Sequence, residues 1–209
     1  MSRQLLAFSL LFGLSTAAWA QAEDAAPLSG DPSAPTFHQG GRTPVWLPRG
    51  AFLGTYLRRG MVTPQPRLQW QVTFFEKRKD ALVFVAEGGI GYAVARPGTA
   101  LEGFDVPVDS FYEHTAQVGM GYRNQSPDGI HWGFQVTGGP LWYGAHMTNV
   151  DDERYSAGLV EGRFHLGYQL GSTVLGVSVG YGEPFSYRKR SVARLFAGGV
   201  LVGFFADWR

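Results

Sequence analysis

The chain has no cysteine, so no disulfide contributes to its stability, although an exported protein could form one. Its 18 basic and 17 acidic residues leave a formal net charge of +1, which gives no overall attraction to nucleic acid. The H-E-x-x-H zinc signature, the P-loop and a cysteine nucleophile are missing as well. We therefore expect no nucleic-acid partner, no metal or other cofactor and no catalytic residues.

The chain also lacks an apolar run of about 20 residues, the length that a membrane-spanning helix needs. The shorter run Leu5–Leu14 follows Arg3 and precedes the small residues of segment 18–20 (AWA), as in a secretory signal peptide. We expect residues 1–20 to be such a peptide, cleaved after Ala20; the alternative is a buried first helix. An exported chain of this kind can enter a membrane only as strands, and only a closed barrel leaves no backbone unpaired in lipid.

Residues 21–48 have little periodicity and include five prolines between Pro27 and Pro48. Proline is unsuited to the interior of a helix or to a central strand, so this segment is expected to be a flexible tail rich in proline and glycine. Alternatively, it lines or plugs the interior of a barrel formed by residues 49–209.

Apolar and polar residues alternate along most of the chain after residue 49, which is the pattern of strands whose two faces meet different surroundings. In the stretch 111–123, for example, Tyr112, Val118 and Tyr122 share one face, and Glu113 and Gln117 share the other. No helical period competes with this alternation. The predicted strands are Gly50–Leu57, Arg67–Glu76, Ala81–Ala95, Ser110–Arg123, Ile130–Tyr143, Arg154–Leu170, Thr173–Gly182 and Ser191–Trp208.

The connections between these strands alternate in length. The segments RRGMVTPQP, RPGTALEGFDVPVD, GAHMTNVDDE and EPFSYRKR are long, whereas KRKD, NQSPDG and LGS are short. Transmembrane barrels have short turns on the periplasmic side and longer loops outside. We therefore predict an all-β fold, an eight-stranded antiparallel up-and-down barrel with both ends on the side of the short turns.

Aromatic residues stand at the two limits of the apolar faces. Tyr112 and Tyr122 are ten positions apart, as are Trp132 and Trp142. Ten residues span about 33 Å along a strand and, at a tilt of about 40°, about 25 Å along the axis, the height of a lipid-facing band between two aromatic girdles. We predict one girdle with Tyr122, Trp132, Tyr168 and Trp208, and another with Tyr92, Tyr112, Trp142 and Tyr181. Alternation alone leaves open a soluble lipocalin-like carrier, whose apolar faces would point inward around a lipid.

The last residues, VGFFADWR, combine Gly203 with alternating apolar residues and an aromatic at Trp208. Here the sequence resembles bacterial outer-membrane β-barrel proteins, and its strand number resembles the small OmpA/OmpX/OmpW-type class. The resemblance covers the signal peptide and roughly residues 50–209; it departs at Arg209, because the family usually ends on an aromatic. It implies a monomer in the outer membrane of a Gram-negative bacterium, in contact with lipid and lipopolysaccharide and inserted by the barrel-assembly machinery.

The polar faces would then point into the barrel. An eight-stranded barrel is just wide enough to be filled by side chains or to hold one small ligand, and charges inside it need partners. Glycines on the same face, such as Gly89, Gly91 and Gly133, would leave room for longer side chains opposite. The predicted lumen network comprises Arg67, Glu87, Glu113, Gln117, Arg123, Gln135, Glu161, Arg163 and His165.

The function that follows is that of a non-enzymatic outer-membrane barrel with a structural or adhesive role, a small ligand or a narrow pore. An alternative is a lipid A-modifying enzyme, since outer-membrane deacylases carry a His and a Ser on the outward face. His114 has a suitable position, but Ala116 occupies the place of the serine. Basic residues expected in the outer loops could bind lipopolysaccharide phosphates: Arg58, Arg59, Arg188, Lys189 and Arg190.

Overall fold

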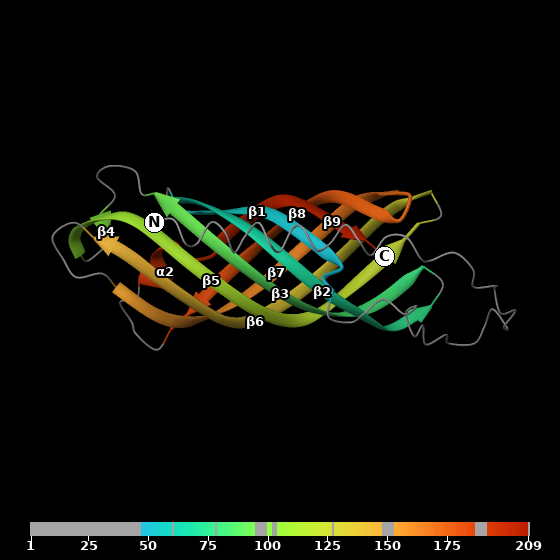
Figure 1. The fold of residues 1–209 in the computed structure, drawn as a ribbon, viewed down its shortest axis with the longest axis horizontal. Helices are drawn as coiled ribbons and strands as arrows, with labels where there is room; N and C mark the ends of the chain where they lie inside the picture. Colours follow the sequence, from blue (N-terminus) through green and yellow to red (C-terminus); the bar gives the residue numbers. More distant parts are fainter. Residues whose placement is uncertain are drawn as a thin grey trace, which may run out of the picture. The chain divides into compact units, whose positions relative to one another are not determined.

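The computed structural model describes residues 47–59, 61–77, 79–94, 100–101, 104–126, 128–147, 153–186 and 192–208. The predicted tail and signal peptide lie outside these ranges, apart from the tail's last residues. Figure 1 shows long tilted strands and one short helix. The elements are β1 Gly50–Arg58, β2 Met61–Lys77, β3 Asp80–Val94, β4 Ala100–Leu101, β5 Phe104–Gln125, β6 Ile130–Met147, β7 Glu153–Leu170, β8 Thr173–Phe185, α2 Val192–Phe196 and β9 Gly199–Trp208.

The eight long strands form one closed antiparallel barrel. Each of them pairs with its neighbour in the chain, and β1 pairs with β9 through partners such as Gly50 and Asp207. The two-residue strand β4 pairs only with the start of β5, so β3 closes the wall by pairing with β5 directly. This strand order confirms the predicted eight-stranded meander. Because the barrel is closed, none of its eight strands is an unpaired edge strand.

The two ends of the barrel differ in their connections. One end, called the terminal end here, holds the start of β1, the end of β9 and the short turns β2–β3, β5–β6 and β7–β8. The predicted tight turns KRKD, NQSPDG and LGS are confirmed. The opposite end, called the loop end, holds the β3–β5, β6–β7 and β8–β9 connections, and Figure 1 places α2 and β4 there.

The predicted long loop between the first two strands is wrong. β1 ends at Arg58 and β2 begins at Met61, so RRGMVTPQP holds a tight turn followed by six strand residues. Successive residues of a strand direct their backbone hydrogen bonds to opposite neighbours. The backbone oxygen of Gln69 accepts a hydrogen bond from Arg49 next to β1, so the odd-numbered residues of β2 bond to β1. The even-numbered Pro64 and Pro66 therefore turn their backbone towards β3. The β2–β3 ladder starts only at the next residue, Arg67, so neither proline has to donate to it.

The predicted last strand, Ser191–Trp208, is also too long. Its first part forms helix α2, and the strand itself begins at Gly199. Gly198 and Gly199 have φ values of 69° and 99°, which glycine adopts without a steric penalty, and they separate the helix from β9. The expectation that no helix interrupts the alternation is therefore wrong at this place.

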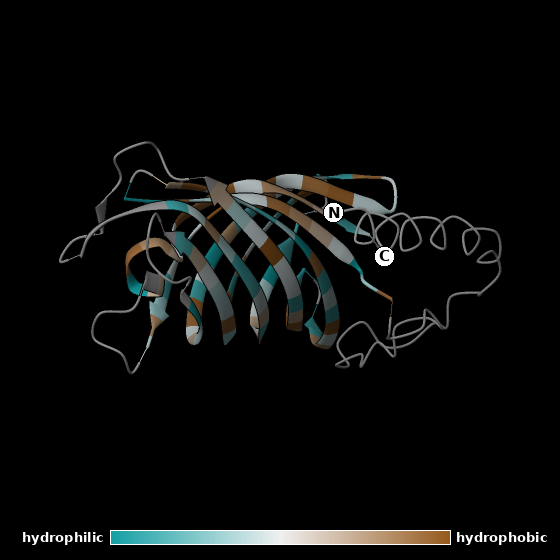
Figure 2. Ribbon diagram, turned by 60° about the vertical axis from the view of Figure 1, so that its left-hand side comes forward, coloured by the Kyte–Doolittle hydropathy of each residue, from teal (hydrophilic) through white to brown (hydrophobic). Residues whose placement is uncertain are grey.

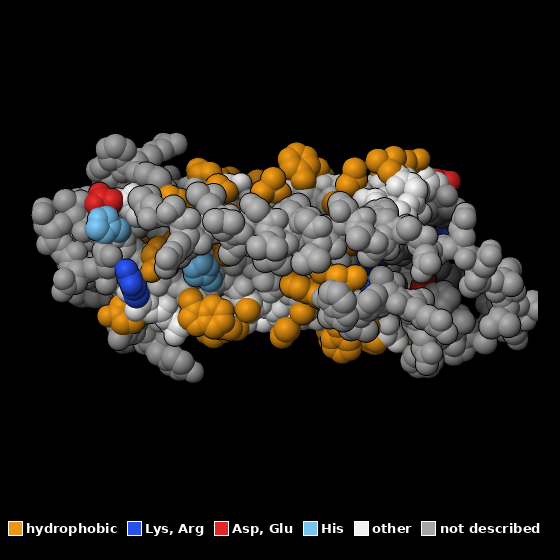
Figure 3. All heavy atoms as spheres, in the orientation of Figure 1, with side chains coloured by type: hydrophobic (Ala, Val, Ile, Leu, Met, Phe, Trp, Pro, Cys, Tyr) orange, Lys and Arg blue, Asp and Glu red, His pale blue; other side chains and the backbone are white. Residues whose placement is uncertain are grey.

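The two faces of the barrel wall follow the alternation. Apolar side chains point outward, and Val118 and Phe204 are each 68% exposed. Figure 2 shows the change of hydropathy along the strands, and Figure 3 shows hydrophobic side chains distributed over the side of the barrel. Because the predicted apolar faces lie outside and the polar ones inside, the lipocalin-like arrangement is wrong for this chain.

Candidate functional site: the lumen of the barrel

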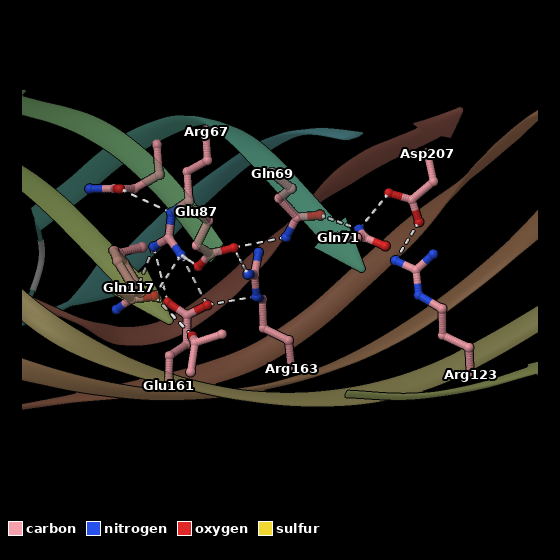
Figure 4. A network of polar contacts seen from close by, with 12 residues as sticks. Arg67, Gln69, Gln71, Glu87, Gln117, Arg123, Glu161, Arg163 and Asp207 are labelled. Carbon is pink, nitrogen blue, oxygen red and sulfur yellow. Dashed lines mark hydrogen bonds and ion pairs between the residues drawn. The ribbon is translucent and has the colours of Figure 1, made fainter. Parts of the chain in front are cut away.

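Four charged side chains meet in the middle of the lumen. Arg67 of β2, Glu87 of β3, and Glu161 and Arg163 of β7 all occupy inward positions of their strands, and none is more than 3% exposed. They lie together because the ladder places β2 beside β3, while β7 faces them across the narrow barrel. Figure 4 shows the four side chains converging.

These four residues form a closed ring of ion pairs, called the charge ring here. Arg67 Nη1 lies 2.8 Å from Glu87 Oε1, and Arg67 Nη2 lies 3.0 Å from Glu161 Oε2. Arg163 Nε lies 2.7 Å from Glu161 Oε1, and its Nη2 contacts Glu87 Oε2. Two positive and two negative groups balance, which is the condition under which charges can remain buried.

Neutral side chains complete the hydrogen bonds of the carboxylates. Gln69 Nε2 donates to Glu87 Oε2 at 2.8 Å. Tyr56 donates its hydroxyl hydrogen to Glu161 and accepts a hydrogen bond from Arg67 Nη2 at 2.9 Å. Each carboxylate of the charge ring therefore has a neutral donor in addition to its two arginines.

Two further glutamines connect the charge ring to neighbouring strands. Gln117 Oε1 accepts from Thr137 Oγ1 at 2.9 Å and from Arg67 Nη1 at 3.5 Å. With its amide nitrogen turned to His165, Gln135 donates to His165 Nε2 at 3.0 Å and accepts from Arg163 Nε at 3.3 Å. The predicted residues Gln117, Gln135 and His165 thus belong to the same network.

Towards the terminal end the network continues along the axis. Gln71 Nε2 lies 3.2 Å from both Gln69 Oε1 and Asp207 Oδ1. Asp207 Oδ2 in turn lies 2.8 Å from Arg123 Nη2. The predicted residue Arg123 is therefore joined to the charge ring through two glutamines and an aspartate, as Figure 4 shows.

Glu113 is the predicted lumen acid that is not part of the charge ring. It is 0% exposed and accepts a hydrogen bond from Gln65. The amide group of Gln65 lies beside Gly91, in the space that a side chain there would occupy. Its Oε2 has no hydrogen-bond partner, and the same is true of Thr115 Oγ1, Gln117 Nε2, Arg163 Nη1, His165 Nδ1 and Ser178 Oγ. Polar atoms buried in this way are the places where ordered water or a polar ligand is expected.

Small and aromatic residues shape the space around the charge ring. A Cβ atom at Gly89 would lie 2.6 Å from Arg67 Cγ, so the predicted role of this glycine in making room agrees with the geometry. The Phe52 ring centroid lies 4.7 Å from Arg163 Cζ and 5.8 Å from Arg67 Cζ, distances at which a cation is attracted to a ring. The sequence analysis missed Phe52 and Tyr56, because both faces of β1 are largely apolar.

The loop end of the lumen is apolar, which the sequence did not predict. Inward residues of six strands, of α2 and of the residue that follows it belong to one buried cluster, and this part of the cluster is called the apolar plug here. Its α2 member Phe196 packs on Phe111, with ring centroids 6.3 Å apart. The plug consists of Met61, Ala93, Phe111, Leu141, Tyr143, Leu159, Leu201, Ala193, Phe196 and Ala197.

The predicted lipopolysaccharide residues are only partly described. Arg58 Nη1 lies 3.2 Å from Glu183 Oε2, and Arg58 Nη2 donates to the backbone oxygen of Arg194 at 2.8 Å. Arg59 is exposed in the β1–β2 turn. Residues 188–190 lie outside the described part of the chain, so the predicted clustering of the five residues stays a prediction.

The segment Gly176–Gly180 reads GVSVG, which has the G-x-S-x-G spacing of serine hydrolases. In those enzymes the serine stands on a sharp turn between a strand and a helix, whereas Ser178 lies within β8 and is buried. Its register partner is His165, but neither Ser178 Oγ nor His165 Nδ1 has a hydrogen-bond partner. The spacing alone therefore does not identify a nucleophile.

On the outward face of the described strands, His114 does not stand directly beside a serine. The register partner of His114 is Trp142, whose partner on the other side is Ser156, so a tryptophan separates the histidine from that serine. Within the residues that the structure describes, no three His, Asp or Glu side chains gather as a metal site. None of the helices in this part of the chain has the length and hydropathy to cross a membrane.

Comparison with known proteins adds no family to this description. No protein-family model matches the chain, and no curated protein matches it.

Proposed function

We propose that the chain is an integral outer-membrane protein without enzymatic activity, whose barrel spans the lipid and whose lumen is closed. The observation that carries this proposal is the distribution of polarity across the wall: large apolar side chains point outward, and a balanced charge ring lies inside. A soluble barrel of this kind would leave a continuous apolar surface in water, which soluble monomers avoid. In lipid the same surface is favourable, because the closed barrel has no free backbone edge.

The arrangement of the aromatic residues supports this placement. At the terminal end, the rings of Tyr122 and Trp132 lie 5.3 Å apart, and the indole nitrogen of Trp208 donates to the backbone oxygen of Pro48 at 2.9 Å. Towards the loop end, Tyr92 and Tyr112 are register partners. Two aromatic rims on either side of an apolar band are typical of transmembrane barrels.

The proposal of a closed lumen, rather than a pore, depends on two barriers in series. The charge ring fills the middle of the barrel, with its four charged groups paired to one another. The apolar plug then covers the loop end, where Phe111, Leu141 and Leu159 are 0% exposed. An ion would have to break the first barrier and be dehydrated in the second.

Reconstituted protein should therefore show no steady conductance in a planar bilayer. The expected record is a flat current over a range of voltages and salt concentrations, with only brief events at the time of insertion. Stable channels whose conductance rises in proportion to salt would contradict the closed lumen, and Glu113, Glu161 and Arg163 would then be the residues to test for ion selectivity.

We propose lipopolysaccharide as a partner of the loop end, with the basic residues Arg58, Arg59, Arg188, Lys189 and Arg190 as anchor. Arginine suits phosphate because its planar group donates two parallel hydrogen bonds. Neutralising Arg188, Lys189 and Arg190 together should reduce the lipopolysaccharide that co-purifies with the protein and make the remainder less sensitive to salt. Unchanged retention across a salt series would remove these three residues from the proposed contact.

A further inference from the structure

Helix α2 fills part of the lumen with its own side chains. In α2, Ala193 is 0% exposed and Phe196 3%; Ala197, which follows the helix, is 1% exposed, and all three belong to the apolar plug. The ring of Phe196 packs on Phe111 of the barrel wall. A five-residue helix has little stability of its own, so this packing, together with its contacts at the rim, holds it in place.

At the rim, α2 is held by one arginine of the wall. Arg58 presents Nη1 and Nη2 to the two carboxylate oxygens of Glu183, at 3.2 and 3.4 Å. The same Nη2 donates to the backbone oxygen of Arg194 in α2 at 2.8 Å. Arg58 therefore binds a carboxylate and a helix carbonyl at once, directly beside the apolar plug.

The charge at this place favours an anion. Among the described residues, Glu183 pairs with Arg58 and lies within the electrostatic influence of a second guanidinium group, that of Arg194. The hydroxyl of Tyr181 already donates to the Glu183 carboxylate at 3.0 Å. The guanidinium of Arg194 donates to the backbone oxygen of Ser186 at 2.9 Å and keeps its positive charge at the rim. A second carboxylate would balance the group.

We propose that the space filled by α2 is a binding site for a fatty-acid-like amphiphile, with one alkyl chain and a carboxylate head. The chain would replace Phe196 and Ala193 in the apolar plug, and the head would take the place of the Arg194 carbonyl on Arg58, as a second carboxylate beside Glu183. α2 thus presents to the barrel the two features that such a ligand would bring, an apolar body and an oxygen acceptor.

The structure also limits how far the chain can reach. Below the apolar plug, Tyr56 donates to Glu161, and the charge ring closes the lumen. The site is therefore open only towards the loop end and binds rather than transports. This inference deepens the proposed function and rests on it, because the closed charge ring forms the inner limit of the site.

The test uses the absence of cysteine from the chain. The variant Phe196→Cys, reconstituted in lipid vesicles, is treated with a membrane-impermeant maleimide in the presence of decanoate, decanol or decyltrimethylammonium. If the ligand displaces α2, decanoate should raise the labelling rate about tenfold, because a buried side chain becomes reachable only in the opened state. Decanol and the cationic amphiphile should change the rate little.

Two controls make the result specific. Val118→Cys, in the middle of the lipid-facing band, should stay unlabelled with each amphiphile, because the impermeant reagent does not reach it, and this result excludes a general effect on the membrane. Adding Arg58→Gln to Phe196→Cys should abolish the preference for decanoate. If Phe196→Cys does not fold, Ala197→Cys, in the same cluster, takes its place.

Equal acceleration by all three amphiphiles, or by none, would overturn the proposal. So would a preference for decanoate that persists without Arg58. Failure of the proposed function is a separate outcome, because a conducting lumen would appear as steady current through the wild-type protein in a planar bilayer, whatever the labelling rates are.

Discussion

Arg67→Met should lower the free energy of unfolding by about 3–5 kcal/mol, the cost of leaving buried carboxylates without their partner. Arg67 is 3% exposed and is paired with both Glu87 and Glu161, while Arg163 is the remaining cation of the charge ring. Methionine keeps much of the volume of the arginine stem, so the loss reports the charge rather than a cavity. The measurement is reversible urea unfolding in lipid vesicles.

A double-mutant cycle separates the ion pair from other effects. Arg67→Met together with Glu161→Gln leaves Arg163 and Glu87 as a balanced pair, so the double variant should be more stable than the sum of the single losses predicts, by about 0.5–3 kcal/mol. Lys77→Met, at an exposed position at the end of β2, is the control and should change stability little. If the stability losses of the two single variants simply add in the double variant, Arg67 and Glu161 are not energetically coupled.

Val118→Arg should cost about 2–4 kcal/mol in a bilayer, whereas Tyr122→Arg should cost only about 0–1 kcal/mol. Both side chains point outward from β5, but Val118 lies in the middle of the band and Tyr122 at its aromatic rim. The physical reason is depth, since a guanidinium near the rim reaches water and lipid head groups. The comparison is made by folding titration in vesicles.

The contrast between the two sites matters more than either value. On a soluble barrel Val118→Arg would replace a well-exposed residue and change stability by about 0.5 kcal/mol or less, no more than a substitution at the half-buried Tyr122. Equal costs at Val118 and Tyr122 would therefore argue against lipid on this face. A thinner bilayer should reduce the cost at Val118, because it brings the site closer to the surface.

The sequence was sufficient to predict the barrel because its strands are amphipathic. In β6, Trp132, Phe134 and Val136 alternate with polar residues or glycine, and all three point outward. Short turns such as that between Leu170 and Thr173 then limit the register of neighbouring strands. The alternation also identified which charged residues point into the lumen.

Two features could not be predicted in this way. Alternation gives the face of a side chain but not its partner: Arg67 reaches Glu161, 94 positions away, only because the closed barrel brings β2 and β7 to the same height. Helix α2 is too short for a helical period to show, and its apolar residues fit the alternating pattern of the strand that follows. Glu113 illustrates the same limit, since its face was predicted but not its place outside the charge ring.

The measurement that tests the central claim most directly is fractionation of cells that produce the full chain. A barrel whose apolar face meets lipid should stay with the outer-membrane fraction through high-salt and alkaline washes and be released only by detergent. Recovery of the folded protein in the osmotic-shock fluid, or its release by salt alone, would contradict a lipid-spanning barrel.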